Sequence, residues 1–136
     1  MKKRIFILAA LLSTGLIGSM TATTKSSHSE IMTKEADGSY IINTTTLGKD
    51  VRGFRGNTPL SIHIKKGKII DIKPLANQET PKFFNKVKQE LLNKWNGMKV
   101  SKAASVQVDG VTGATFSSKA VKEHVKRGIA YYLNTK

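Results

Sequence analysis

A β-hairpin is the feature that most constrains the fold of this chain. Apolar residues alternate with polar ones over residues 59–65, and the alternation resumes over residues 68–73. This period of two is typical of strands with one buried face. Lys66-Gly67 between them predicts a tight turn. The sequence therefore predicts two antiparallel strands with one apolar face, whose inward residues are Leu60, Ile62, Ile64, Ile70 and Ile72.

Other segments complete a small α+β domain. Residues 39–46 are rich in Tyr, Ile and Thr and predict a further strand, and residues 98–108 predict another that ends in Val106 and Val108. Thr80-Pro81 predicts the start of a helix that Gly97 ends. A last helix should run to about Leu133, with Gly128 as a weak point. We expect a single domain in which two helices pack on a sheet that contains the hairpin. The apolar stripes of these helices, interpreted as core, are Phe84, Val87, Leu91 and Trp95, then Ala120, Val121, Val125, Ile129 and Tyr132.

The N-terminus predicts export. Lys2, Lys3 and Arg4 precede a largely apolar run that continues to Met20, which is the order of a signal peptide. No ideal small-x-small cleavage site is present, and the run is long enough for an uncleaved membrane anchor. We therefore predict a signal peptide or anchor over residues 1–22, a polar linker over 23–37 and one domain over 38–136. The domain is expected outside the cytoplasm, in the periplasm or at the cell surface.

Charge and cysteine content narrow the possible functions. The chain carries a net charge of +14, of which the three basic residues at the N-terminus account for three and the rest of the chain for +11. Such a charge favours anionic partners, among them membrane surfaces, cell-wall polymers and acidic redox proteins. No aromatic-interleaved basic motif accompanies it, so nucleic-acid binding is not expected. Because the chain has no cysteine, disulfides, iron–sulfur clusters and c-type haem are excluded, and the dispersed histidines predict no metal site.

The densest motif lies near the C-terminus. Residues 109–118 read DGVTGATFSS. Gly110 and Gly113 allow close backbone approach, and Ser117 or Ser118 is placed to cap the last helix. Such a helix start offers N–H groups to a phosphate. The run lacks the Gly-Lys-Ser/Thr ending of a Walker A loop and the glycine spacing of a Rossmann fingerprint. From the residues alone it is either a phosphate site or an ordinary loop.

The string from Asp109 to Thr115 resembles the Asp-x-x-Ser/Thr-Gly-Ala-Thr flavinylation motif of the FMN-binding domain family. This family includes the C subunit of sodium-pumping NADH:quinone reductases, the Rnf G subunit and small exported flavoproteins. Residues 53–81 also resemble the family's opening hairpin and its Glu-Thr-Pro signature. The resemblance implies FMN joined through its phosphate to the Thr115 hydroxyl. It further implies that an FAD-dependent, magnesium-requiring FMN transferase makes this phosphoester after export.

The resemblance also assigns roles to neighbouring residues. It implies that Asp109 is recognised by the transferase, although a turn or helix-capping aspartate is the alternative. Glu79 and Thr80 would lie near the isoalloxazine ring, and Thr80 is equally explained as a helix cap. From their positions, each just inside a predicted helix beside a site segment, Lys82 and Lys119 are candidates for stabilising a reduced anionic flavin. The residues expected to approach, line or donate to the phosphate are Gly110, Thr112, Gly113, Ala114, Ser117 and Ser118.

We therefore predict an exported or membrane-tethered electron carrier with covalent FMN, which passes electrons between a membrane donor and an extracytoplasmic acceptor. It would be a carrier domain without catalytic residues of its own, since the flavin performs the redox chemistry. Two alternatives stay open. One is a non-redox basic module that docks on anionic wall or membrane, and the other is a detached subunit of a larger flavin-dependent reductase.

Overall fold

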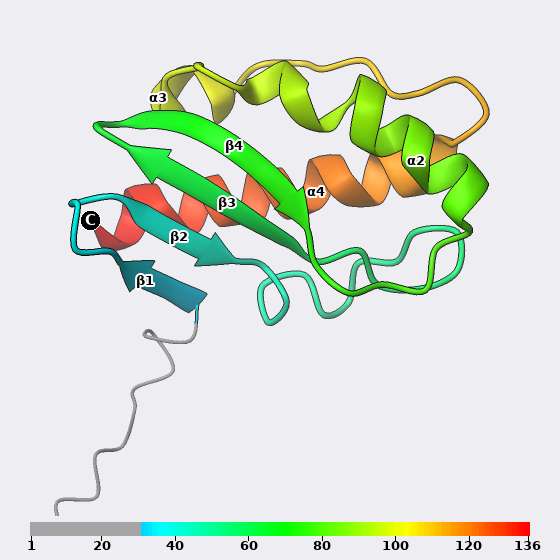
Figure 1. Ribbon diagram of the computed structural model, residues 1–136, viewed down its shortest axis with the longest axis horizontal. Helices are drawn as coiled ribbons and strands as arrows, with labels where there is room; N and C mark the ends of the chain where they lie inside the picture. The colour runs from blue at the N-terminus through cyan, green and yellow to red at the C-terminus, as the bar shows by residue number, and fades with distance from the viewer. Residues whose placement is uncertain (1–30) are drawn as a thin grey trace, which may run out of the picture.

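A four-stranded antiparallel sheet forms the centre of the fold. The computed structural model describes residues 31–136. The strands are β1 (Met32–Lys34), β2 (Tyr40–Asn43), β3 (Leu60–Lys65) and β4 (Lys68–Pro74), and they lie in the order β1-β2-β3-β4. The long helix α4 (Thr115–Thr135) lies behind the sheet in Figure 1, and α2 (Pro81–Glu90) lies beyond the β4 edge. The predicted α+β class and single small domain are confirmed.

The hairpin is confirmed, with one change in register. Lys66 and Gly67 have φ values of 52° and 72°. A two-residue hairpin turn whose twist matches that of the strands requires positive φ at both positions. A bulge between His63 and Ile64 shifts the pairing, so Ile64 lies opposite Ile69. Ile69 is consequently buried, whereas Ile70 is 44% exposed. The prediction that Ile70 faces the core was wrong, because the bulge inserts one residue and reverses the faces.

The sheet begins earlier in the chain than the predicted domain boundary. β1 falls within residues 23–37, the predicted polar linker, and pairs with β2 through Met32 opposite Ile42. β2 is shorter than the predicted strand of residues 39–46. Residues 1–22, the predicted signal or anchor, lie outside the described residues. Within residues 31–136, no helix is both long and apolar enough to cross a membrane.

The helix predicted after Thr80 starts where expected but is divided. Thr80 is extended at the N-cap and Pro81 opens α2, which ends at Glu90. A 3₁₀ helix, η2 (Leu92–Trp95), follows, and Gly97 then takes a φ of +79°. The stripe residues Phe84, Val87, Leu91 and Trp95 are all buried in the common core. Their interpretation as core residues is confirmed.

The strand predicted over residues 98–108 was wrong. Pairing with β4 stops at a single bridge between Lys68 and Lys99, and a short helix, α3 (Val100–Ala103), follows. Both terminal residues of this helical turn are buried, because a spacing of three puts them on one face. Residues 106–114 then run to α4 without regular secondary structure. Helix packing therefore prevailed over the local strand propensity of this segment.

Helix α4 covers one face of the sheet with the predicted stripe, all of whose members are buried, namely Ala120, Val121, Val125, Ile129 and Tyr132. Tyr132 packs edge-on against Tyr40 of β2, with ring centroids 5.6 Å apart. Gly128 is the point of closest approach, since a Cβ there would lie 2.6 Å from Cδ1 of Ile62. The glycine that we predicted as a weak point is therefore what lets the helix lie close to β3.

A buried histidine ties α4 to the loop after β2. His124 Nδ1 lies 2.8 Å from Oγ1 of Thr44, which in turn accepts the Leu60 N–H. Among the described residues, Nε2 of His124 is buried without a hydrogen-bond partner. Burial lowers the pKa of His124, and the charge of Arg127 lowers it further. The folded protein therefore holds this imidazole in its neutral form near neutral pH.

This histidine makes stability depend on pH. The unfolded chain binds a proton at His124 below about pH 6.5 while the folded chain resists it, so stability falls as pH drops through that value. We expect the free energy of unfolding to fall by up to about 1.4 kcal/mol per pH unit below pH 6.5. Urea unfolding at pH 7.5 and 5.5, with NMR titration of the His124 ring, measures this. A His124 midpoint at or above 6.5 with constant stability would contradict it.

Candidate functional site

The loop before α4 delivers Thr115 to the start of a helix. Gly113 has a φ of +85° and Ala114 serves as N-cap without a side-chain hydrogen bond, so Thr115 is the first helical residue. The first N–H groups of a helix have no intrahelical partner and carry a partial positive charge. The Thr115 side chain is exposed at this positive end.

The other hydroxyl residues of the run differ in exposure. Ser117 and Ser118 are buried, and their hydroxyls are engaged. Ser117 Oγ donates to Oε2 of Glu79 over 2.9 Å, and Ser118 Oγ accepts the Val111 N–H over 2.9 Å. The prediction that one of them caps α4 was wrong, because both lie inside its first turn. Thr112, like Thr115, is exposed.

An aromatic hollow of about 310 Å³ lies on one side of Thr115. Its wall includes three phenylalanines that are unusually open to solvent, since Phe54, Phe83 and Phe116 are 60%, 43% and 63% exposed. The rings of Phe54 and Phe116 lie 6.5 Å apart. Its volume is at the lower end of the range for small-molecule sites. Exposed aromatic side chains gathered around a concavity indicate a site for a flat apolar ligand.

Glu79 supplies the charged group of the aromatic hollow. Glu79 is 8% exposed, and its carboxylate accepts hydrogen bonds from Ser117 Oγ and from the backbone N–H of Arg55. A Cβ at Gly53 would lie 2.2 Å from Oε1 of Glu79, so only glycine leaves room for the carboxylate. The hydrogen bonds compensate for the burial of the charge. Glu79 is therefore held in a fixed position at the wall of the hollow.

A second, basic hollow of about 280 Å³ lies beside the same helix start. Lys119 and Lys122 line it, and Thr115 lines it as well as the aromatic hollow. Two lysines beside a helix N-terminus form an environment suited to a phosphate. Thr115 therefore lies between the aromatic hollow and the basic hollow.

The predicted site residues divide between these hollows. Asp109 lines neither of them, and its backbone carbonyl accepts a hydrogen bond from Lys94 Nζ over 3.3 Å. Lys82 also lines neither hollow, whereas Lys119 lines the basic one. The predicted residues at the aromatic hollow are Glu79, Thr80, Gly113, Ala114, Thr115 and Ser117, and those at the basic hollow are Gly110, Thr112, Thr115 and Ser118.

The three phenylalanines of the aromatic hollow are not among the site residues predicted from the sequence. Phe116 directly follows Thr115, Phe54 directly follows Gly53, and Phe83 lies three residues after Thr80. Phe83 lies outside the buried stripe of its helix, and such an aromatic residue at the surface is a signal of ligand contact. Their meeting at one hollow depends on the tertiary fold, since they come from three separate segments.

Comparison with known proteins shows the family of the chain. The FMN-binding domain family matches residues 53–130 of the chain, a range that contains both hollows. The chain belongs to the FMN-binding domain family. The resemblance to this family is thereby confirmed, and FMN is the cofactor after which the family is named.

Two curated relatives are subunits G of ion-translocating oxidoreductase complexes. The protein from Shewanella piezotolerans is 31% identical over 123 residues, which cover 81% of this chain and 57% of the relative. The protein from Shewanella oneidensis is 32% identical over 123 residues, which cover 74% of this chain and 57% of the relative. The chain thus spans a little over half the length of these relatives. No solved structure matches it significantly.

The residues present suit FMN in two respects. The three exposed phenylalanines of the aromatic hollow suit the apolar surface of an isoalloxazine ring. The exposed hydroxyl of Thr115, beside Lys119 and Lys122, suits the phosphate. No cluster of three or more His, Asp or Glu side chains in residues 31–136 could hold a metal ion.

Proposed function

We propose that Thr115 carries FMN through a phosphoester and that the domain is an exported electron carrier. The observation that supports the attachment most is the contrast among the hydroxyls of the motif. Ser117 and Ser118 are buried and engaged in hydrogen bonds, whereas Thr115 is exposed and lines both hollows. Thr112 is exposed too but lines only the basic hollow.

The attachment step is a phosphoryl transfer from FAD by an FMN transferase. Thr115 Oγ forms a bond to the phosphorus of the FMN half, the pyrophosphate bond of FAD breaks, AMP leaves, and the hydroxyl loses its proton. The chain's contribution is to present an accessible hydroxyl at a helix start whose N–H groups attract the phosphate. Lys119 and Lys122 add positive charge on the basic side. Asp109, exposed and outside both hollows, is available for recognition by the transferase.

Once bound, FMN supplies the redox chemistry, and the protein orients it and tunes its potential. The phenylalanines of the aromatic hollow would exclude water from one part of the flavin, and the fixed carboxylate of Glu79 would set the local charge. Thr80 and the Gly113-Ala114 backbone complete this wall. A covalent bond keeps the cofactor on a carrier that lies outside the cytoplasm, where lost FMN is not replaced.

Electrons would pass from a membrane donor to an extracytoplasmic acceptor. The named relatives belong to ion-translocating oxidoreductase complexes, which supports a membrane-associated donor. The basic-then-apolar order of residues 1–22 supports export, with or without retention as an anchor. The domain over residues 38–136 would then act at the membrane surface as a carrier, not as a complete enzyme.

Co-expression with the FMN transferase in an exporting host tests this function. The intact mass is expected to increase by FMN minus water, and the purified protein should be yellow and undergo reversible reduction in an anaerobic titration. The same mass spectrum reports whether residues 1–22 are removed. A colourless protein of unmodified mass that binds anionic vesicles in a salt-dependent manner would instead support the non-redox module.

The lysines near the two helix starts should affect the reduction potential unequally. Replacing Lys119 with glutamine is expected to lower the midpoint potential by roughly 10–30 mV, because a positive charge near the site favours the reduced anionic flavin. Lys82→Gln, with the same change in charge, should have little effect, since Lys82 lines neither hollow. Spectroelectrochemical titration measures both. Equal shifts, or none at either position, would contradict a specific role for Lys119.

A further inference from the structure

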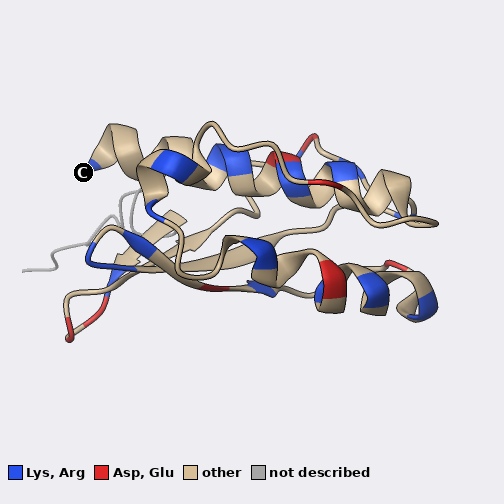
Figure 2. Cartoon of the chain, turned by 90° about the horizontal axis from the view of Figure 1, so that it is seen from above, with Lys and Arg blue, Asp and Glu red and all other residues tan. Residues whose placement is uncertain are grey.

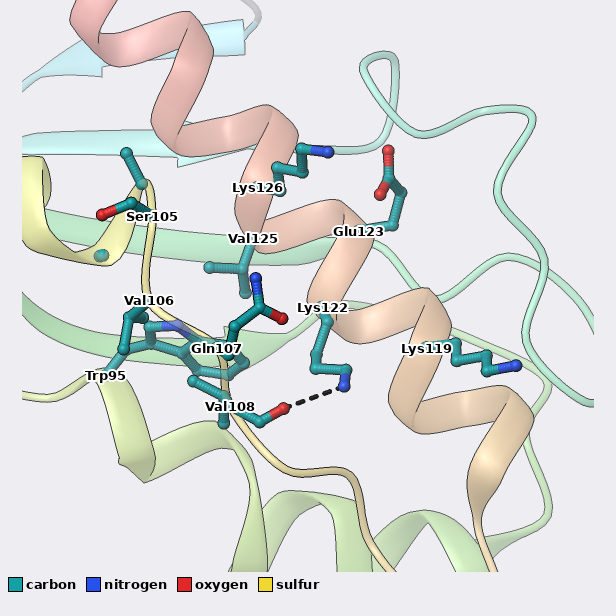
Figure 3. A pocket seen from close by; sticks show the side chains of 12 residues that line it. Trp95, Ser105, Val106, Gln107, Val108, Lys119, Lys122, Glu123, Val125 and Lys126 are labelled. Atoms are coloured by element: carbon teal, nitrogen blue, oxygen red, sulfur yellow. Dashed lines mark hydrogen bonds between the residues drawn. The ribbon is translucent and has the colours of Figure 1, made fainter.

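A further hollow lies away from the aromatic hollow and shares no lining residue with it. It has a volume of about 540 Å³ and runs between one side of α4 and the segment of residues 103–108 (Figure 3). Trp95 is its one aromatic wall residue and is 3% exposed. We call this hollow the α4 groove.

The α4 groove is strongly basic. Lys119, Lys122 and Lys126 line it from α4, at spacings of three and four that put them along one side of the helix. Figure 2 shows basic positions recurring along α4. The acidic residue of this wall, Glu123, is already paired with Arg127 over 2.9 Å. The groove therefore presents an excess of positive charge to an incoming group.

The opposite wall is a peptide segment with unused hydrogen-bonding groups. Among the described residues, Gln107 makes no hydrogen bond, and Val108 makes one, by accepting from Lys122 Nζ over 2.9 Å (Figure 3). Ser105 and Gln107 are exposed. Val106 and Val108 favoured a strand, yet this segment pairs with no strand of the described fold. A segment of this kind can receive an extended peptide by backbone pairing.

From this arrangement we infer that the α4 groove binds an extended, acidic segment of a partner protein. The partner's backbone would pair with the free backbone groups of Gln107 and with the Val108 N–H, since the N–H groups of Ser105 and Val106 already donate to the Lys102 carbonyl. Its Asp or Glu side chains would contact Lys119 and Lys126, because Lys122 Nζ is held by the Val108 carbonyl. A second copy of this basic chain is a poor occupant because like charges repel. A single-stranded nucleic acid lacks a stacking surface here, since the Trp95 ring is buried.

The position of the groove suits a partner in electron transfer. Lys119 and Lys122 line both the α4 groove and the basic hollow, which Thr115 also lines. An occupant of the groove would therefore lie beside the proposed attachment residue. The binding itself does not depend on FMN, so the Thr115→Ala protein should bind the same peptide, and a failure of the attachment proposal would leave this inference intact.

A matched pair of charge reversals tests the inference. The probe is a fluorescein-labelled ten-residue peptide of alternating Glu and Thr, titrated with the full-length protein and followed by anisotropy. Lys126→Glu changes a lysine that lines the α4 groove, whereas Lys86→Glu makes the same change at an exposed position of α2 that lies outside it. We expect saturable binding that Lys126→Glu weakens by about tenfold or more and Lys86→Glu by no more than about twofold. Hydrogen exchange at the amides of Gln107 and Val108 should slow in the complex.

Three outcomes would overturn the inference. The inference would be overturned if the peptide did not bind saturably. It would also be overturned if the two variants weakened binding equally, because binding would then depend only on the net charge of the protein. Equally tight binding of an oligothymidylate of the same charge, with unchanged exchange at Gln107, would indicate general polyanion attraction. Circular dichroism of both variants checks that folding is intact, and Lys126→Gln provides a milder version of the same test.

Discussion

Replacing Thr115 with alanine is expected to abolish the covalent gain of FMN completely. The hydroxyl of Thr115 is exposed at the first residue of α4, and no other side-chain atom at this position can form the phosphoester. Thr115→Ser keeps a hydroxyl at the same helix start and should retain attachment, although at a reduced rate. Intact mass after co-expression with the transferase, together with flavin fluorescence of the denatured protein on a gel, measures the result.

Local controls make this experiment specific. Thr112→Ala removes the other exposed hydroxyl of the motif and should leave the added mass in place. Trypsin releases residues 103–119 as one peptide, and fragment ions from it can assign the modification to Thr112, Thr115, Ser117 or Ser118. A modification that persists in Thr115→Ala, or fragment ions that assign it to Ser117 or Ser118, would contradict the proposal.

Replacing Gly128 with valine is expected to destabilise the fold by about 1–3 kcal/mol or more. Side-chain atoms at this position would meet Cδ1 of Ile62 at 2.6 Å and Cγ2 of Thr44 at 3.0 Å, both belonging to fully buried residues. Overpacking in such a core forces α4 away from the sheet. Replacing glycine also raises helix propensity, but this stabilises the helix by less than about 1 kcal/mol. The cost of overpacking exceeds this gain.

Ala130→Val is the matched control for this substitution. Ala130 lies two residues further along the same helix, on its exposed face, so valine there changes helix propensity without overpacking the core. Urea unfolding should show a marked loss of stability for Gly128→Val and a loss of no more than about 0.5 kcal/mol for Ala130→Val. Similar losses in the two variants would contradict a packing role for Gly128.

The periodic segments were predictable from the sequence because their local pattern and their tertiary role agree. The hairpin, the start of α2 and the buried stripes of α2 and α4 all follow from apolar residues at spacings that match the strand or helix period. Residues 98–108 were not predictable in this way. Their residue types favour a strand, yet in the fold Val100 and Ala103 are buried together on one face of a helical turn.

Local sequence also could not show the bulge in the hairpin. The alternation of Ile70 and Ile72 predicts a regular strand, but the bulge brings Ile69 into the core in place of Ile70. Gly128 is a similar case, since glycine within a helical pattern signals only low propensity. Its packing role becomes visible when Ile62 of the facing strand lies against it.

The family of this protein, its α+β class and the motif that contains Thr115 could be read from the sequence, since each depends on residues adjacent or periodic along the chain. Which hydroxyls are accessible depends on the tertiary fold, because Ser117 and Ser118 are engaged by Glu79 and Val111 once α4 begins at Thr115. The tertiary fold also brought Phe54, Phe83 and Phe116 together into one hollow. Ligand sites of this kind depend on proximity between distant segments, and such proximity arises only when the core has packed.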